Sequence, residues 1–282
     1  MQIRNICAAC AILVVAAGPG AAETLKGQAL AMGEGTVRTF VEVTAAGAPR
    51  AIGVILSRGA LAGLPPLKNA TSRCFDLDGN GRLDGARECE GDKEFRLALP
   101  AKAEGGDIPV RWVAVNWNAE GHPPAAWSVP HFDFHFYLAE PNEIALIRVG
   151  ACTFFINCDD RKIALKPVPA KYVAPDHVNV DATVSLMGNH LIDARAPELA
   201  DPRKHGFTHT WIYGAYDGRI TFLEPMITLG FLLSRPDVCT PIRQPAAWAR
   251  AGYYPTRYCI RYARDDGSTT VSLEGLVART AD

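Results

Sequence analysis

The feature that most constrains the fold is one alternating segment, Pro130-His-Phe-Asp-Phe-His-Phe-Tyr137. Successive side chains of a β-strand point to opposite faces, so His131, Asp133 and His135 share one face and the three phenylalanines share the other. An aromatic face of this kind is typical of a strand packed on a core. The segment therefore predicts a strand whose polar face needs solvent, hydrogen-bond partners or a ligand.

Further strand signals recur along the chain. Within residues 37–43 every second residue is β-branched, and residues 110–117 form a β-branched and aromatic run. Asp217-Gly218 and Asp266-Gly267 each separate two strand-like runs, and this dipeptide favours two-residue hairpin turns because it tolerates positive φ. Helix signals are limited to segments that begin at Pro141 and Pro245. We expect a mainly β protein, an antiparallel sandwich or barrel-like domain with few short helices.

The first residues are typical of a cleavable signal peptide. Arg4 precedes an apolar stretch that ends in the small residues Gly20, Ala21 and Ala22. Cleavage after Ala22 predicts a periplasmic or secreted chain, and no later segment has the roughly 20 apolar residues of a transmembrane helix. We divide the chain into a signal peptide (1–22), a main β-rich domain (23–235) and a C-terminal hairpin extension (236–282).

Six cysteines follow the predicted signal peptide, and they fall into three neighbouring pairs. An even number of cysteines in an exported chain predicts disulfides, although the sequence does not fix their connectivity. The alternative, a zinc site, lacks a C-x-x-C motif in the mature chain. The pairs of neighbours are Cys74 with Cys89, Cys152 with Cys158, and Cys239 with Cys259.

The charge and the motifs exclude several classes of function. The formal net charge is −1 at pH 7, and acidic and basic residues are interspersed, so no nucleic-acid partner is expected. The chain contains no G-x-S-x-G, H-E-x-x-H or Walker sequence, which argues against the common serine hydrolases, zincins and P-loop enzymes.

An acidic segment between Cys74 and Cys89 has the spacing of a calcium loop. Oxygen-bearing side chains occupy its positions 1, 3, 5 and 9, and glycine occupies position 6. Arg87 stands where the bidentate glutamate of an EF-hand belongs, so the alternative is a turn without an ion. The predicted calcium residues are Asp76, Asp78, Asn80, Arg82 and Asp84.

The polar face of the 130–137 strand is the second candidate site. Strand positions two apart lie about 6.6 Å apart and positions four apart about 13 Å, so one metal can take Asp133 with one histidine but hardly both. His190 and Glu224 are the candidates for the remaining ligands, and such a mixture suits zinc, iron or manganese. His122 and Tyr137 are candidates for supporting contacts. The alternatives are a buried hydrogen-bond network and a solvated strand face.

Five segments together resemble a known family. They are Gly121-His-Pro-Pro, the 130–137 strand, Met187-Gly-Asn-His190, Tyr213-Gly-Ala-Tyr-Asp-Gly218 and Phe222-Leu-Glu-Pro-Met226. They resemble an uncharacterised domain family of exported bacterial proteins, typified by a Thermus protein described in connection with an anti-sigma factor system. The likeness covers about residues 25–235. It implies a β-rich fold and a ring-like homo-oligomer, and it assigns no catalytic residue.

The sequence therefore favours an exported metal-associated protein and leaves other functions open. One alternative is a non-catalytic binding or self-assembly module of the bacterial envelope, whose aromatic strand edges recruit a partner or copies of the chain. Another is a pocket for an apolar or carbohydrate ligand, suggested by the abundance of tryptophan and tyrosine. The sequence does not say whether the protein is an enzyme.

Overall fold

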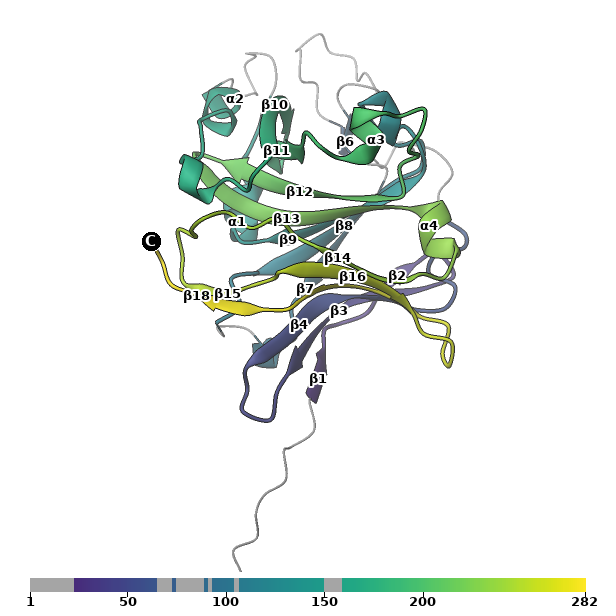
Figure 1. Ribbon diagram of the computed structural model, residues 1–282. Coiled ribbons are helices and arrows are strands. Elements are labelled where there is room, and N and C mark those ends of the chain that lie inside the picture. Colours follow the sequence, from purple (N-terminus) through teal and green to yellow (C-terminus); the bar gives the residue numbers. More distant parts are fainter. Residues whose placement is uncertain (1–22, 65–72, 75–88, 91–92, 104–106, 150–158) are drawn as a thin grey trace, which may run out of the picture.

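The computed structural model describes residues 23–64, 73–74, 89–90, 93–103, 107–149 and 159–282 of the 282-residue chain. In this part the protein is mainly β, with antiparallel sheets and a few short helices, which confirms the predicted fold class. Two large sheets pack face to face as the layers of a sandwich (Figure 1).

The first sheet joins the two ends of the described chain. Its strands follow the order β1, β3, β4, β17, β16, β14, with β2 paired to β3. Residues of the predicted C-terminal extension therefore lie in the same sheet as residues from the start of the chain, through pairing of β17 with β4. The bounds are β1 (Glu23–Lys26), β2 (Leu30–Met32), β3 (Gly35–Val43), β4 (Pro49–Leu56), β14 (Asp237–Pro241), β16 (Arg257–Tyr262) and β17 (Thr269–Glu274).

The second sheet contains the alternating segment, which is confirmed as a strand, β9 (His131–Tyr137). The sheet has the order β10, β11, β12, β13, β9, β8, β7, so β9 lies between β13 and β8. The other bounds are β7 (Lys93–Ala98), β8 (Trp112–Asn118), β10 (His177–Val184), β11 (Gly188–Asp193), β12 (His209–Tyr216) and β13 (Arg219–Thr228).

The two Asp-Gly hairpins are both present, with different loops. Asp217 and Gly218 have φ values of 51° and 69° and connect β12 directly to β13, which confirms the two-residue turn. At Asp266-Gly267, β16 and β17 pair as predicted, but residues 263–268 form a longer loop than the dipeptide indicates.

Short elements complete the described part. The helix predicted at Pro141 is α1, whereas the helix predicted over residues 245–251 is wrong. Trp248 instead forms a β-bridge with Ala281 and stacks on Tyr254, with ring centroids 3.7 Å apart. The bounds are β5 (Arg73–Cys74), β6 (Cys89–Glu90), β15 (Gly252–Tyr254), β18 (Val277–Arg279), α1 (Pro141–Ala145), α2 (Asp159–Ala164), α3 (Pro197–Ala200), α4 (Leu229–Leu233), and the 3-10 turns Ala101–Ala103, Ala125–Trp127 and Ala170–Tyr172.

The main core lies between the two sheets. Phe132, Phe134 and Phe136 of β9 are fully buried there, together with Val54 of β4 and Val271 of β17. This placement confirms that the aromatic face of β9 is core. It also fixes the opposite, polar face of β9 on the outside of the sandwich.

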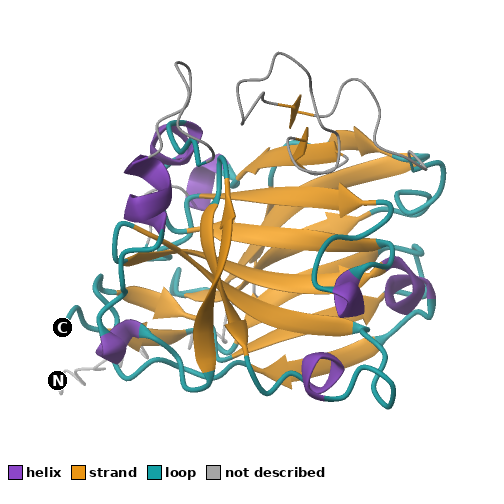
Figure 2. Ribbon diagram, turned by 90° about the horizontal axis from the view of Figure 1, so that it is seen from above, coloured by secondary structure: helices purple, strands orange, loops and turns teal. Residues whose placement is uncertain are grey.

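The outer face of the second sheet is covered as well. Two smaller apolar clusters lie on it, one around Tyr137 and Phe222 and the other around Trp127 and Met226. The helices lie at the margins of this face (Figure 2). The polar side chains of β9 are therefore buried between two apolar clusters, which rules out the solvated strand face as an alternative.

Some sequence predictions fall partly or wholly outside the described residues. Cys239 and Cys259 form a disulfide between β14 and β16, and Cys74 and Cys89 are register partners in the pairing of β5 with β6. The signal peptide, the calcium loop 76–84, Cys152 and Cys158 lie outside the described part. No helix among the described residues is both long and apolar enough to cross a membrane.

Candidate metal centre

Six polar side chains gather in two groups of three on the outer face of the second sheet. We call His135, His190 and Glu224 the inner triad, and His122, His131 and Asp133 the outer triad. In each triad one ligand atom per residue lies within 4.8 Å of the other two. Each triad thus offers two imidazole nitrogens and one carboxylate oxygen, which is a known donor set for zinc and for non-haem iron.

The inner triad is assembled from three strands. The Nε2 of His135 on β9 lies 3.5 Å from Oε1 of Glu224 on β13, and the Nε2 of His190 on β11 lies 3.9 Å from Oε2. The side chains of His135 and Glu224 are each 1% exposed. Ligands of one zinc ion lie about 3–4 Å apart, and both of these nitrogen–oxygen distances fall in that range.

The outer triad combines β9 with the loop before it. The Nε2 of His131 lies 3.2 Å from Oδ1 of Asp133, and the Nε2 of His122 lies 3.6 Å from Oδ2. His131 is fully buried, whereas the side chain of His122 is 36% exposed. The outer triad is therefore more open to solvent than the inner triad, whose most exposed side chain, His190, is 12% exposed.

All four histidines are held by their other ring nitrogen. Each Nδ1 faces an oxygen that accepts a hydrogen bond, so Nδ1 carries a proton and Nε2 is the nitrogen that faces the triad. Anchoring of this kind is usual for histidines that bind metals. The acceptors are the carbonyl oxygens of Pro123, Val129 and Ala182 for His122, His131 and His190, at 2.9, 2.7 and 2.9 Å, and Oδ1 of Asn116 for His135, at 3.2 Å.

Two asparagines of β8 support the triads. Asn118 donates from Nδ2 to Oδ2 of Asp133 at 2.8 Å, and Asn116 donates from Nδ2 to Oε2 of Glu94 at 3.2 Å while it accepts from His135. These contacts fix the orientation of one residue in each triad. Supporting contacts of this type raise metal affinity because they hold the ligands in place before the ion binds.

The ionisation states of the two triads differ. Burial raises the pKa of Glu224 well above its usual value, and the negative charge of Asp133 raises it further. Burial lowers the pKa of His135, and it lowers the pKa of His190 to about 4, with the neighbouring His135 acting in the same direction. Near neutral pH the inner imidazoles are therefore uncharged, which is the form that binds a metal ion.

Asp133 behaves in the opposite way. Burial raises its pKa, but attraction to His131 and hydrogen bonding with His122 and His131 outweigh that effect and hold the pKa well below its usual value. The carboxylate of the outer triad is thus ionised near neutral pH and can bind a cation without first losing a proton.

The inner triad depends on a glycine. Gly214 on β12 pairs with His190 on one side and Phe222 on the other. The ring of Phe222 lies over this position and contacts the rings of His135 and His190, with centroids 4.9 and 5.2 Å apart. A Cβ at Gly214 would lie 2.0 Å from a carbon of the Phe222 ring. A side chain at this position must therefore displace the ring that supports both histidines.

We expect Gly214→Ala to lower the free energy of unfolding by about 2 kcal/mol, the usual scale of overpacking, and to weaken metal binding. Urea denaturation in the presence of a chelator measures the first effect. Gly206→Ala is the matched control, because a Cβ there meets nothing within 4 Å. Equal stability of the two variants would contradict the expectation.

The structure regroups the residues singled out from the sequence. Asp133 lies with His122 and His131, whereas His135 lies with both His190 and Glu224. His122, expected in a supporting place, contributes its Nε2 to the outer triad. Tyr137 stacks beside the inner triad, with its ring centroid 5.7 Å from that of His135.

Three supporting residues were missed by the sequence analysis: Glu94, Asn116 and Asn118. The signal was present in the strand Trp112–Asn118, where two asparagines two residues apart interrupt an otherwise apolar run. Asparagine is depleted in strands, so a pair of them on one face indicated hydrogen-bond partners on that face.

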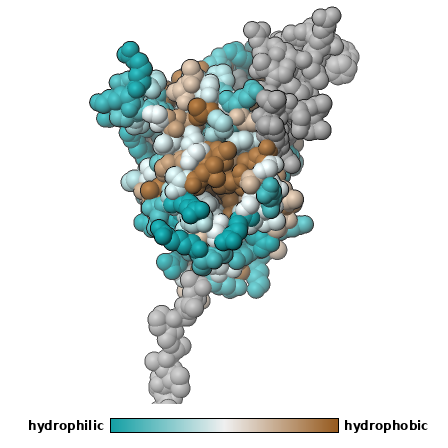
Figure 3. Space-filling model, turned by 90° about the vertical axis from the view of Figure 1, so that its right-hand side faces the viewer, coloured by the Kyte–Doolittle hydropathy of each residue, from teal (hydrophilic) through white to brown (hydrophobic). Residues whose placement is uncertain are grey.

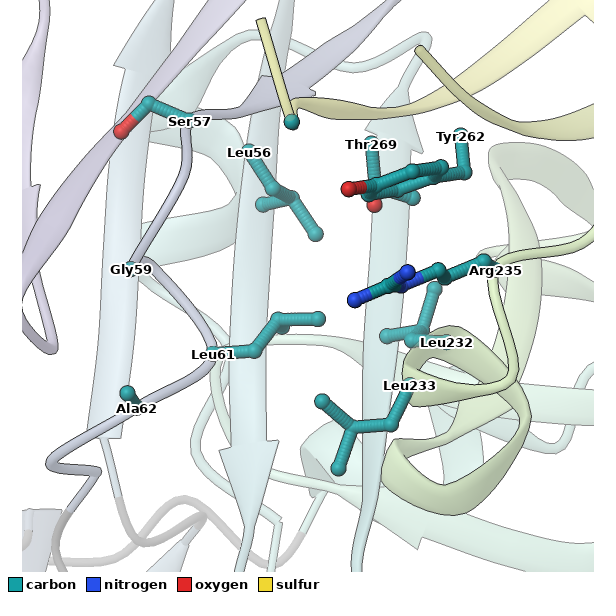
Figure 4. Close-up of a pocket in the computed structure, with 11 residues that line it drawn as sticks. Leu56, Ser57, Gly59, Leu61, Ala62, Leu232, Leu233, Arg235, Tyr262 and Thr269 are labelled. Atoms are coloured by element: carbon teal, nitrogen blue, oxygen red, sulfur yellow. The ribbon is translucent and has the colours of Figure 1, made fainter. Parts of the chain in front are cut away.

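A pocket of about 230 Å³ lies at the end of the sandwich near α4 (Figure 4). Leu61, Leu232 and Leu233 line it, and the Arg235 guanidinium lies 5.1 Å from the centre of the Tyr262 ring (Figure 4). The face that carries α4 shows an apolar patch among hydrophilic residues (Figure 3), and the Leu233 side chain is 58% exposed. None of the residues of either triad lines this pocket.

Fold and site together define a class: an antiparallel β-sandwich with buried histidine and carboxylate groups that can hold a metal ion. No family model, curated protein or solved structure matches the chain. The resemblance to the exported bacterial family therefore stays a prediction, and the function is argued from the site.

Proposed function

We propose that this chain is an exported protein that binds a transition metal ion, zinc, iron or manganese, at the inner triad. The observation that carries the proposal is the convergence of two imidazole Nε2 atoms and one carboxylate in a buried site. The Nε2 of His135 and Oε2 of Glu224 have no hydrogen-bond partner among the described residues. Buried polar atoms without partners are costly, so their placement is explained if a cation binds between them.

The donor set indicates what the ion can do. Two histidines and one carboxylate would leave coordination positions of a bound ion free, and such an ion would supply Lewis-acid chemistry, activating water or polarising an oxygen of a substrate. The residues of the chain supply the orientation: Asn116 fixes the ring of His135, and the Ala182 carbonyl fixes that of His190. Export is proposed from residues 1–22 alone.

The test is the metal content of the mature protein, secreted from the full chain and purified without a histidine tag. We expect about one equivalent of zinc, iron or manganese at the inner triad, lost in Glu224→Gln, which keeps the size of the side chain and removes its charge. His205→Ala, at an exposed histidine outside both triads, should retain the metal of the wild type.

Two outcomes would overturn the proposal. One is a wild-type protein that takes up none of the three metals on dialysis against each. The other is an unchanged metal content in folded Glu224→Gln. Either result would favour the alternative, a non-catalytic binding or assembly module in which the triads form a buried hydrogen-bond network. The apolar patch at α4 is the feature that favours this alternative.

A further inference from the structure

The outer triad differs from the inner triad in its access to solvent. The most exposed side chain of the outer triad, His122, is 36% exposed, whereas that of the inner triad, His190, is 12% exposed and His135 and Glu224 are each 1% exposed. His122 comes from the loop before β9 and lies at the opening of the group. A metal bound here would have a coordination position on the solvent side, as catalytic metal sites do.

The outer triad is also a complete donor set of its own. The buried Nε2 of His131 and Oδ1 of Asp133 face each other at 3.2 Å, and neither has a further hydrogen-bond partner in the part of the chain that the structure describes. The Val129 carbonyl anchors the ring of His131, and Asn118 binds the other carboxylate oxygen. None of these donors is shared with the inner triad.

Aromatic side chains border the outer triad. The ring centroid of Trp127 lies 6.0 Å from that of His122, and the ring centroid of Phe207 lies 5.5 Å from that of His131. These rings place apolar groups directly beside the triad. The charge of a divalent ion, two neutral histidines and one carboxylate sums to a net positive site, which attracts an anion in such surroundings.

We propose that the outer triad holds a second metal ion and that the solvent-side position of this ion binds a small anion. The inference rests on the proposed function, because it takes the inner triad as the first metal position. The two ions differ in access: the outer ion, beside the exposed His122, exchanges its ligand with solvent more readily than the inner ion. The natural substrate or ligand would then carry a small anionic group.

The first experiment counts metal ions. Wild-type protein loaded with cobalt(II) should bind about two equivalents, and His122→Ala and Glu224→Gln should each bind about one. His122 is the residue of choice because its side chain is partly exposed, so its removal leaves the core intact; Asp133→Asn is the second variant for the same position. One equivalent in the wild type, lost in Glu224→Gln and kept in His122→Ala and Asp133→Asn, would overturn the second site and leave the proposed function standing.

The second experiment locates the anion. Azide added to cobalt-loaded protein should change the visible absorption spectrum of the wild type and of Glu224→Gln, which keeps the outer ion. It should leave the spectrum of His122→Ala unchanged, because that variant keeps only the inner ion, which is less accessible to solvent. A spectral change in His122→Ala that is absent from Glu224→Gln would place the anion at the inner triad. No change in any of the three would overturn anion binding.

Discussion

Zinc is expected to raise the free energy of unfolding of the metal-free protein by about 4 kcal/mol when free zinc is about a thousand times its dissociation constant. The inner triad draws its ligands from β9, β11 and β13. Since the three atoms converge only in the folded chain, the ion binds the native state and stabilises it by mass action.

Chemical denaturation at a series of free zinc concentrations measures this effect. Glu224→Gln should show a much smaller increase in stability with zinc, and His205→Ala should follow the wild type. A wild-type midpoint that does not change with zinc concentration, although the protein is folded, would contradict metal binding at the triad. The comparison with Glu224→Gln, which keeps every histidine of the chain, also corrects for zinc bound by histidines of the unfolded state.

Part of the core was predictable because a single strand, β9, contributes three buried phenylalanines to it. The alternation of residues 131–137 separates the phenylalanines from the polar residues, and the structure places the phenylalanines between the sheets. The Asp217-Gly218 turn was predictable for a similar reason, since both residues adopt positive φ there. Local patterns of this kind need no knowledge of distant pairing.

The triads could not be derived in the same way because they depend on the register of separate strands. His190 reaches the inner triad across β12, through its pairing with Gly214. Register shifts occur on both sides of this contact, between Gly214 and Ala215 and between Asn179 and Ala182. A shift of one residue turns every side chain of a strand to the other face, so the sequence named His190 without fixing its partners.

The burial of the polar face of β9 could not be predicted from the sequence either. It follows from two apolar clusters that bring together distant parts of the chain, such as Trp127 with Met226, and Tyr137 with Phe222. The incorrect helix at residues 245–251 has the same origin, because Trp248 is held by Ala281 and Tyr254. In each case contacts between remote segments override the local pattern.

Acid should destabilise the metal-free protein through His190. In the folded chain its pKa is about 4, against an ordinary value of 6.5, because burial and the neighbouring His135 disfavour the charged ring. The unfolded chain takes up the proton first as the pH falls. The contribution of His190 is therefore complete above pH 6.5 and is lost progressively down to about pH 4.

The size of this effect follows from the shift of the pKa, and it amounts to at most about 3 kcal/mol, at 1.36 kcal/mol per pKa unit. Glu224 has the opposite effect on stability. Its pKa is raised in the folded chain, so the folded chain takes up this proton before the unfolded chain does, and the fold gains stability from it as the pH falls. The prediction is therefore a difference between proteins: from pH 7 to about pH 4, the wild type should lose up to about 3 kcal/mol more than His190→Gln.

Urea denaturation of both proteins across this pH range, with a chelator present, measures the difference. His205→Gln is the matched control and should follow the wild type. Parallel pH profiles for the wild type and His190→Gln would mean that His190 is not held neutral in the fold. The pKa of His190 would then not be lowered by the fold, and a metal ion would have to compete with a proton for its ring. A steeper wild-type profile would mean that burial already supplies the uncharged imidazole that a metal ion needs.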